Sequence, residues 1–158
     1  MNYKTRQSYT EGTVYVCCFI SNIYSALGTE SGANMKIRGA IEFTVTEHSG
    51  DRVVSEMPIG PGVKNPFGVV HAGAVIWLAD VTASILVFGP EEPAEGIKGF
   101  PLAISLNANF LGNQTEGSFR AVASFVKRGR TVSVVRTTVY GAGNKVIADV
   151  TTTHVLSK

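Results

Sequence analysis

Residues 65–89 read NPFGVVHAGAVIWLADVTASILVFG, and the expected fold of the chain follows from this stretch. It opens on turn residues, becomes almost entirely apolar, and ends at Gly89-Pro90, a pair that commonly follows the last turn of a helix. The pattern predicts about five turns of α-helix that start near His71. Because nearly every face of this helix is apolar, we expect it to be buried on all sides.

A helix of this kind suits either a membrane or the interior of a protein. Asp80 lies at its centre, and a carboxylate there costs a membrane span about 2.5–3.5 kcal/mol on insertion scales. The rest of the chain reads as amphipathic strands, which suit water rather than lipid. The sequence therefore predicts a helix wrapped by its own protein and no membrane partner.

His71 and Asp80 are the two ionisable residues of the helical stretch. They lie nine positions apart, about 13–14 Å along the helix axis and on opposite faces. Asp80 instead shares its face with Gly73, Trp77 and Ser84. If the helix start and Asp80 serve one site, Asp80 must meet the helix start of a second copy. That arrangement predicts a homodimer at least, and leaves open a homotetramer built as a dimer of dimers.

The rest of the main domain predicts a sheet. Segments rich in β-branched and aromatic residues alternate with short turns, which is typical of an antiparallel meander. Their expected ranges are 36–46, 52–57, 102–111, 118–128, 130–140 and 145–156. Ala103 and Ser105 are two residues apart on one strand and should share a face. One long helix with such a sheet gives an α+β fold, in which a curved antiparallel sheet wraps the helix.

The first part of the chain differs from the rest. Apolar residues between positions 13 and 27 recur at three- and four-residue steps, which favours an amphipathic helix, although 13–17 would also suit a strand. We expect a partly helical N-terminal extension over 1–34 and the main domain over 35–158.

Composition narrows the partners. A formal net charge of +2 gives no general attraction to nucleic acid. Cys17 and Cys18 are adjacent, so they can neither form a structural disulfide within the chain nor provide metal-ligand spacing. We expect reduced thiols in a cytoplasmic protein that uses no metal.

The central stretch carries a motif that begins in the turn before the helix and continues into it. Its members are Asn65, Gly68, His71-Ala72-Gly73 and Leu78-Ala79-Asp80. This spacing resembles the hot-dog-fold acyl-CoA thioesterases, and their phenylacetate-pathway branch most closely. The resemblance continues through 107–111 and 127–131 and covers roughly residues 35–156. It implies the hot-dog fold, with the long central helix wrapped by the sheet.

Asp80 is the leading candidate for chemistry, because a carboxylate inside an apolar helix must be paired, protonated or placed for work. A structural Asp at a dimer seam is the alternative. The resemblance implies a general base that activates water, or a nucleophile that attacks the thioester carbonyl. Backbone N–H groups at the helix start, those of Ala72 and Gly73, would hold the oxyanion. Ala72 stands where the family has Gly.

Three polar residues have weaker assignments. The resemblance implies that Asn65 orients the attacking water, and a plain Asn-Pro turn is the rival reading. His71 is expected to order the helix start rather than to act as a base. The Ser84 hydroxyl could contact the water or the Asp80 carboxylate, or only a helix carbonyl. Some relatives carry a hydroxyl at the position of Ala103, and Ser105 could replace it.

Basic residues gather around Gly129. Lys127, Arg128 and Arg130 read either as a solvated hairpin turn or, as the resemblance implies, as contacts for the phosphates of coenzyme A. Trp77 and the apolar helix face would favour an aryl or medium-length acyl group. Coenzyme A would enter as part of the substrate, and no separate cofactor is expected.

The sequence therefore predicts hydrolysis of an acyl-CoA thioester to a free acid and coenzyme A. A non-catalytic acyl-CoA-binding or ligand-sensing module on the same fold is the first alternative. A dehydratase or isomerase is the second, and His71 is poorly placed for the base that those reactions need.

Overall fold

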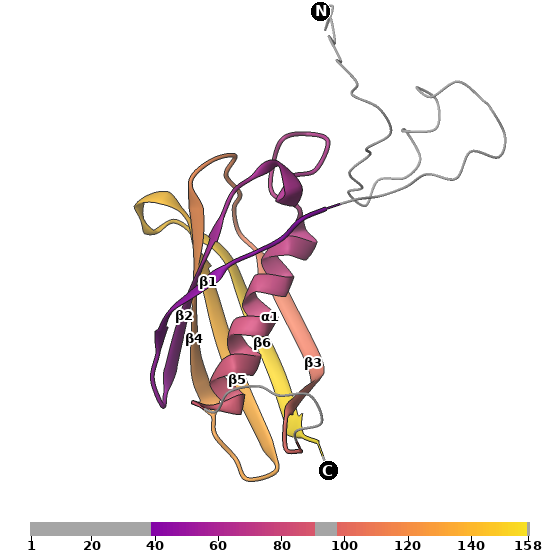
Figure 1. The fold of residues 1–158 in the computed structure, drawn as a ribbon, viewed down its shortest axis with the longest axis vertical. Helices are drawn as coiled ribbons and strands as arrows, with labels where there is room; N and C mark the ends of the chain where they lie inside the picture. Colours follow the sequence, from indigo (N-terminus) through magenta and orange to yellow (C-terminus); the bar gives the residue numbers. More distant parts are fainter. Residues whose placement is uncertain (1–38, 91–97, 158) are drawn as a thin grey trace, which may run out of the picture.

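The computed structural model describes residues 39–90 and 98–157 (Figure 1). The expected N-terminal extension over 1–34, its helix over 13–27 and the cysteine pair lie outside the described residues. The boundary between the extension and the main domain therefore stays a prediction.

The described part consists of one long α-helix, six strands and two short 3-10 turns. Their bounds, in chain order, are β1 Thr44–His48, β2 Arg52–Pro58, η2 Pro61–Val63, α1 Ala72–Phe88, β3 Pro101–Phe110, β4 Ser118–Lys127, β5 Val132–Tyr140, η3 Ala142–Asn144 and β6 Val146–Leu156. The predicted central helix is confirmed, with His71 as its N-cap residue. It ends at Gly89, whose φ of 89° suits glycine and whose N–H donates to Ile85 O at 3.0 Å. No helix in the described part is long and apolar enough to cross a membrane.

The six strands form one antiparallel sheet in the order β1-β2-β4-β5-β6-β3, and α1 lies against one face of it (Figure 1). The α+β fold with an antiparallel sheet is confirmed. The predicted meander is right for β4, β5 and β6, and wrong for β3, which pairs with β6 rather than with β4. The connection over 111–117 joins β3 to β4 and is long enough for the two strands to lie apart in the sheet. Its first residues stay on β6, because Leu111 N and Gly112 N both donate to Ile147 O.

The first predicted strand is shorter than expected. Residues 39–43 are not part of a strand, and β1 begins at Thr44. Phe43 instead packs against Trp77 of α1, with ring centroids 5.0 Å apart in an edge-to-face arrangement. The expected strand over 36–46 is therefore wrong for 39–43, where Ile41 and Phe43 pack against the core instead.

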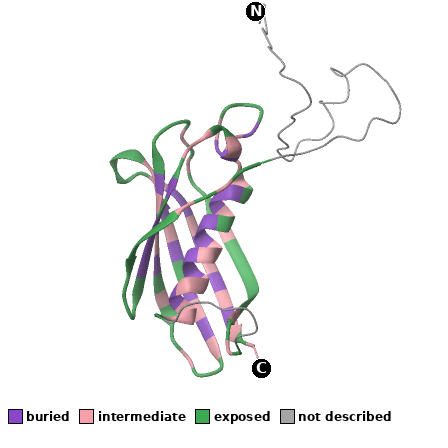
Figure 2. Cartoon of the chain, viewed as in Figure 1, coloured by how far each residue is buried: buried purple, intermediate pink, exposed green. Residues whose placement is uncertain are grey.

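The helix packs one side against the sheet, and buried residues alternate with less buried ones along it (Figure 2). Its buried residues are Ala74, Val75, Leu78, Ala79, Thr82, Ala83 and Leu86. Trp77 on the other side is 40% exposed. The expectation of burial on all sides is therefore wrong for the described chain taken alone, because the sheet covers one side only.

Two threonines fix the helix to the sheet. The hydroxyl of Thr82, which is fully buried, forms hydrogen bonds with Leu78 O at 2.6 Å and with Ser55 Oγ at 2.9 Å. From β5, the hydroxyl of Thr137 donates to Ala79 O at 3.3 Å. These contacts set the rotation of α1 and therefore the direction in which Asp80 points.

Replacing Thr82 by Val is expected to lower the free energy of unfolding by about 1–3 kcal/mol, because the buried Ser55 hydroxyl loses its partner. Urea unfolding at a fixed protein concentration measures the change. Thr138→Val is the matched control, since Thr138 is a partly exposed neighbour on the same strand as Thr137. Equal effects of the two substitutions would show that the Thr82 contact does not stabilise the fold.

Strand β3 ends the sheet and is coloured largely as exposed in Figure 2. Among the described residues, β6 is its one partner strand. Large apolar side chains are exposed along it, namely Leu102, Ile104, Leu106 and Phe110. An exposed apolar edge strand of this kind is a surface on which another strand can pair.

A bulge interrupts β3. Ala103 lies opposite His154, but Ser105 lies opposite Thr153, so Ile104 is an extra residue in the ladder. His154 is buried on the helix side of the sheet, and Thr153 is on the outer side. The expectation that Ala103 and Ser105 share a face is wrong, because the inserted residue reverses the alternation.

Candidate active site

The loop before α1 is held at both ends. Lys64 and Val70 form an isolated β-bridge, and the side chain of Asn113 bonds both backbone groups of Val70. The Asn113 amide donates to Val70 O at 2.9 Å, and its oxygen accepts from Val70 N at 3.3 Å. Sequence reasoning missed Asn113, whose place in an ordinary connecting loop gives no signal. It fixes the position from which the helix begins.

Asn65 lies within this loop and is buried. Its side-chain oxygen accepts hydrogen bonds from Phe67 N at 3.0 Å and from Val69 N at 3.3 Å. The oxygen therefore organises the turn, as the Asn-Pro reading expects. Among the hydrogen bonds of the described residues, none uses the Asn65 amide nitrogen, so this donor remains available for a substrate or a water molecule.

His71 caps the helix. Its Nδ1 accepts a hydrogen bond from Gly73 N at 2.9 Å, which confirms that His71 orders the helix start. The same bond changes the expected oxyanion site, because it occupies the N–H of Gly73. Within the described part of the chain, the Ala72 N–H makes no hydrogen bond, so Ala72 offers the first-turn donor that remains open.

The less buried side of α1 carries the expected row of side chains. Gly73 and Trp77 are exposed, and Asp80 and Ser84 are partly exposed one and two turns further along. The shared helix face is thus confirmed. No hydrogen bond of the Ser84 hydroxyl is found among the described residues, and both expected roles of Ser84 stay predictions.

Asp80 is half-buried in an unusual way. Its Oδ1 is inaccessible to solvent and has no hydrogen-bond partner among the described residues, although the residue as a whole is partly exposed. A buried carboxylate oxygen without a partner is unfavourable unless a substrate, a water molecule or another group completes the site. The environment of Asp80, a buried carboxylate oxygen without a partner, is therefore typical of a functional residue.

His154 is the titratable neighbour of Asp80 that sequence reasoning missed. It is fully buried on β6, and its Nε2 lies 2.8 Å from the Thr152 hydroxyl. Burial lowers the pKa of His154 below its usual value, while the charge of Asp80 acts in the opposite direction and raises it. A signal existed, because His154 has the same strand parity as the buried residues Ala148 and Val150.

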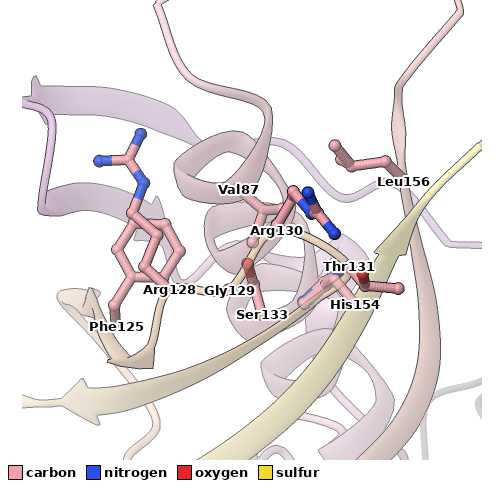
Figure 3. Close-up of a pocket in the computed structure, with 9 residues that line it drawn as sticks. All are labelled: Val87, Phe125, Arg128, Gly129, Arg130, Thr131, Ser133, His154 and Leu156. Atoms are coloured by element: carbon pink, nitrogen blue, oxygen red, sulfur yellow. The ribbon is translucent and has the colours of Figure 1, made fainter.

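A cavity of about 230 Å³ lies near the C-terminal end of α1, where Val87 lines it (Figure 3). Its lining combines apolar, hydroxyl and cationic side chains: Val87, Phe125, Arg128, Gly129, Arg130, Thr131, Ser133, His154 and Leu156. Val87 continues the helix face of Asp80 and Ser84, and His154 forms part of the cavity wall. The cavity therefore reaches the polar group that lies beside Asp80.

Two of the three expected basic residues line this cavity. Arg128 and Arg130 line it, whereas Lys127 does not. Arg128 also donates to Gly50 O at 3.1 Å and lies over the Phe125 ring. Ser105 lies on the outer side of the sheet, so the structure does not bring it to Asp80.

The structure does not bring the helix start and Asp80 of one chain together, since both lie on the same straight helix, about 13–14 Å apart along its axis. No group of three His, Cys, Asp or Glu side chains within 39–90 and 98–157 could hold a metal ion. The expected absence of a metal and of a cofactor stays a prediction.

Comparison with known proteins places this geometry in a family. Residues 67–148 match the model of the thioesterase superfamily. ComA2, a candidate esterase of Bacillus subtilis (strain 168), is 30% identical over 108 residues, which cover 68% of this chain and 83% of that protein. The 1,4-dihydroxy-2-naphthoyl-CoA hydrolase of Escherichia coli (strain K12) is 32% identical over 77 residues, or 48% of this chain and 54% of the hydrolase.

Solved structures agree on the fold. A mutant of the Staphylococcus aureus thioesterase SAV0944 superposes with a TM-score of 0.66 and 26% identity, covering 73% of this chain and 93% of that one. The Haemophilus influenzae thioesterase HI1161 gives a TM-score of 0.65 at 24% identity, covering 72% and 77% of the two chains. The predicted hot-dog fold is confirmed. The closer resemblance to the phenylacetate-pathway branch stays a prediction.

Proposed function

Because this chain belongs to the thioesterase superfamily and is a thioester hydrolase of the hot-dog fold, we propose that it hydrolyses an acyl-CoA thioester with Asp80 as its general base or nucleophile. The observation that carries this proposal is the buried Oδ1 of Asp80, which lacks a hydrogen-bond partner among the described residues. A carboxylate without such a partner can take a proton from water or attack a carbonyl carbon.

The helix start supplies the second half of the site. The Ala72 N–H stands at the positive end of the α1 dipole, where it polarises a thioester carbonyl and stabilises the tetrahedral oxyanion. Gly73 contributes indirectly, because its N–H donates to His71 Nδ1 and so fixes the capping side chain. The amide nitrogen of Asn65 donates to the attacking water or the carbonyl oxygen from the loop beside the helix start.

Two copies are needed to bring these halves together. β3 and α1 are in contact in the described chain, and both expose apolar side chains such as Leu106 and Trp77. In the proposed homodimer, pairing through this surface would bury both side chains and bring Asp80 of one copy to the helix start of the other. The homodimer is part of the proposal, and a tetramer would need a further surface.

The reaction then follows ordinary acyl-transfer chemistry. Water attacks the thioester carbonyl while Asp80 takes one of its protons, and the oxyanion forms against the Ala72 N–H of the second copy. The C–S bond breaks as the carbonyl re-forms, which releases the acid and the thiolate of coenzyme A. If Asp80 attacks directly, an acyl-enzyme anhydride forms first and water hydrolyses it.

The substrate has a charged end and an apolar end. Arg128 and Arg130 at the cavity, with the exposed Lys127 beside them, can bind the phosphates of coenzyme A. Trp77 offers an aromatic surface for the acyl group. Two similar proteins are 1,4-dihydroxy-2-naphthoyl-CoA hydrolases, which favours an aryl acyl group here as well.

The test is release of free thiol from a panel of acyl-CoA thioesters that spans short, medium and aryl acyl groups. We expect turnover of at least one aryl-CoA above the rate of a short-chain thioester. Binding of acyl-CoA without turnover across the whole panel would instead support a non-catalytic binding module.

Replacing Arg130 by Ala is expected to raise KM for an acyl-CoA about tenfold with little change in kcat, because an exposed phosphate contact adds binding energy in the ground and transition states alike. Steady-state kinetics measure the change. The same acyl group on N-acetylcysteamine, which lacks the phosphates, should show no such difference.

Arg120→Ala is the matched control for this substitution. Arg120 is partly exposed, bonds Asn144 Oδ1 at 3.1 Å and lies over the Tyr140 ring, away from the cavity. An equal rise in KM for Arg120→Ala, or none for Arg130→Ala, would remove the Arg130 phosphate contact from the proposal.

A further inference from the structure

Two buried polar atoms lack a hydrogen-bond partner among the described residues, and they are Asp80 Oδ1 and His154 Nδ1. The two atoms are complementary, since a carboxylate oxygen accepts a hydrogen bond and an imidazole N–H donates one. The residues also belong to elements in contact, α1 and β6, and they are close enough for the charge of Asp80 to raise the pKa of His154 against the larger, lowering effect of burial. Each unsatisfied atom thus has its natural partner in the other residue.

Strand register places His154 where it can serve Asp80. On one side it lies opposite Ser133 of β5, and on the other opposite Ala103 of β3. Ala103 has no polar side-chain atom, so β3 provides no side-chain hydrogen-bond donor for Asp80 at the position opposite His154. Ser105, the nearest hydroxyl along β3, faces the other side of the sheet because of the bulge.

We propose that His154 is a positioning residue for Asp80: its Nδ1–H holds Asp80 Oδ1, directly or through one water molecule, and turns Oδ2 toward the substrate. This inference rests on the proposed function of Asp80 and extends it to the residue that orients the carboxylate. His154 itself touches neither the thioester nor the attacking water.

The contact between His154 Nε2 and the Thr152 hydroxyl is compatible with the tautomer that this role needs. When the Thr152 hydroxyl donates to Nε2, at 2.8 Å, the proton of the neutral ring must be on Nδ1. Burial lowers the pKa of His154, which favours the neutral ring at pH 7 even though Asp80 raises it. With the proton on Nδ1, the ring has the donor that the positioning of Asp80 requires.

The charged groups around His154 can be named element by element. Asp80 faces it from α1, and Arg128 and Arg130 share its cavity wall from the turn between β4 and β5. Ser133 and Ala103, its register neighbours on β5 and β3, do not titrate. A hydrogen bond from Nδ1–H stabilises the carboxylate form of a side chain such as Asp80, so its loss is expected to move the acid limb of activity to higher pH.

Two isosteric variants separate the two nitrogens. Asn in place of His154 keeps a donor near the position of Nδ1, whereas Gln places its amide near Nε2 and leaves Nδ1 unreplaced. We expect His154→Gln to lower kcat about ten- to a hundredfold, with KM nearly unchanged. The acid limb of its kcat/KM profile should move up by about one pH unit, and His154→Asn should stay within about threefold of the parent kcat.

Thermal unfolding of both variants controls for folding, because a purely structural role predicts equal losses of activity for Asn and Gln. Equal losses, or an acid limb that stays in place in His154→Gln, would overturn the positioning role.

A second readout does not depend on turnover. The imidazole of His154 is titrated by NMR in the parent and in Asp80→Asn, with its signals assigned from their absence in His154→Asn. Loss of the Asp80 charge should lower the pKa of His154, and an unchanged titration would overturn the pairing. If Asp80→Asn retains full turnover, the proposed function fails; if Asp80 is essential and the Asn and Gln variants are equal, only the role of His154 fails.

Discussion

Replacing Asp80 by Asn is expected to lower kcat for acyl-CoA hydrolysis by about a thousandfold or more, with KM changed by less than about threefold. The amide has the shape of the carboxylate but can neither take a proton nor attack a carbonyl. Because Asp80 lies on the partly exposed side of α1, the substitution should leave the fold intact. Steady-state thiol release with the best substrate of the panel measures the loss.

Asp149→Asn is the matched control for this change. Asp149 lies on the outer side of β6, where its Oδ1 is 3.5 Å from Arg136 Nε in a partly exposed ion pair. Such a pair contributes little to stability, so this variant should retain parent activity. A kcat for Asp80→Asn within threefold of the parent would remove Asp80 from the mechanism.

Replacing Ala72 by Pro is expected to lower kcat about a hundred- to a thousandfold, because it deletes the N–H assigned to the oxyanion. Proline is tolerated here, since Ala72 is the first residue of α1 and needs no helical donor. His71 has φ −66° and ψ 134°, a conformation that a following proline allows. Ala72→Ser keeps the N–H and should stay close to parent activity.

Mixing the two inactive variants tests whether the site is shared. In mixed dimers of Asp80→Asn and Ala72→Pro, one of the two sites combines an intact carboxylate with an intact helix start. Unfolding and refolding an equal mixture should therefore restore about a quarter of parent activity, whereas neither variant alone recovers it. A mixture that stays inactive while forming mixed dimers would show that each site lies within one chain.

Local sequence signals predicted most of the fold. The apolar run with Gly89-Pro90 defined α1, and alternating residues bounded β2 and β4 to within one residue. The position of β3 beside β6 could not be predicted in this way, because pairing between strands distant in sequence depends on tertiary packing. The bulge at Ile104 adds one residue that leaves no mark on the pattern of the strand.

The site was predicted in part for the same reason. Asp80 stood out because a charge in an apolar helix is rare, and the cap formed by His71 followed from its place before α1. The use of the Gly73 N–H by that cap is a detail of side-chain geometry that spacing does not contain. His154 was missed because its proximity to Asp80 arises only when β6 packs under the helix.

The edge of β3, which has no second partner strand among the described residues, also makes the activity depend on the concentration of the enzyme. If a second copy covers that edge, as proposed, association obeys mass action, and dilution removes active sites and fold stability together. Specific activity would then fall at low enzyme concentration, and saturating substrate, which bridges both copies, would restore it. Total activity in the cell would then rise more steeply than in proportion to the amount of enzyme that is made.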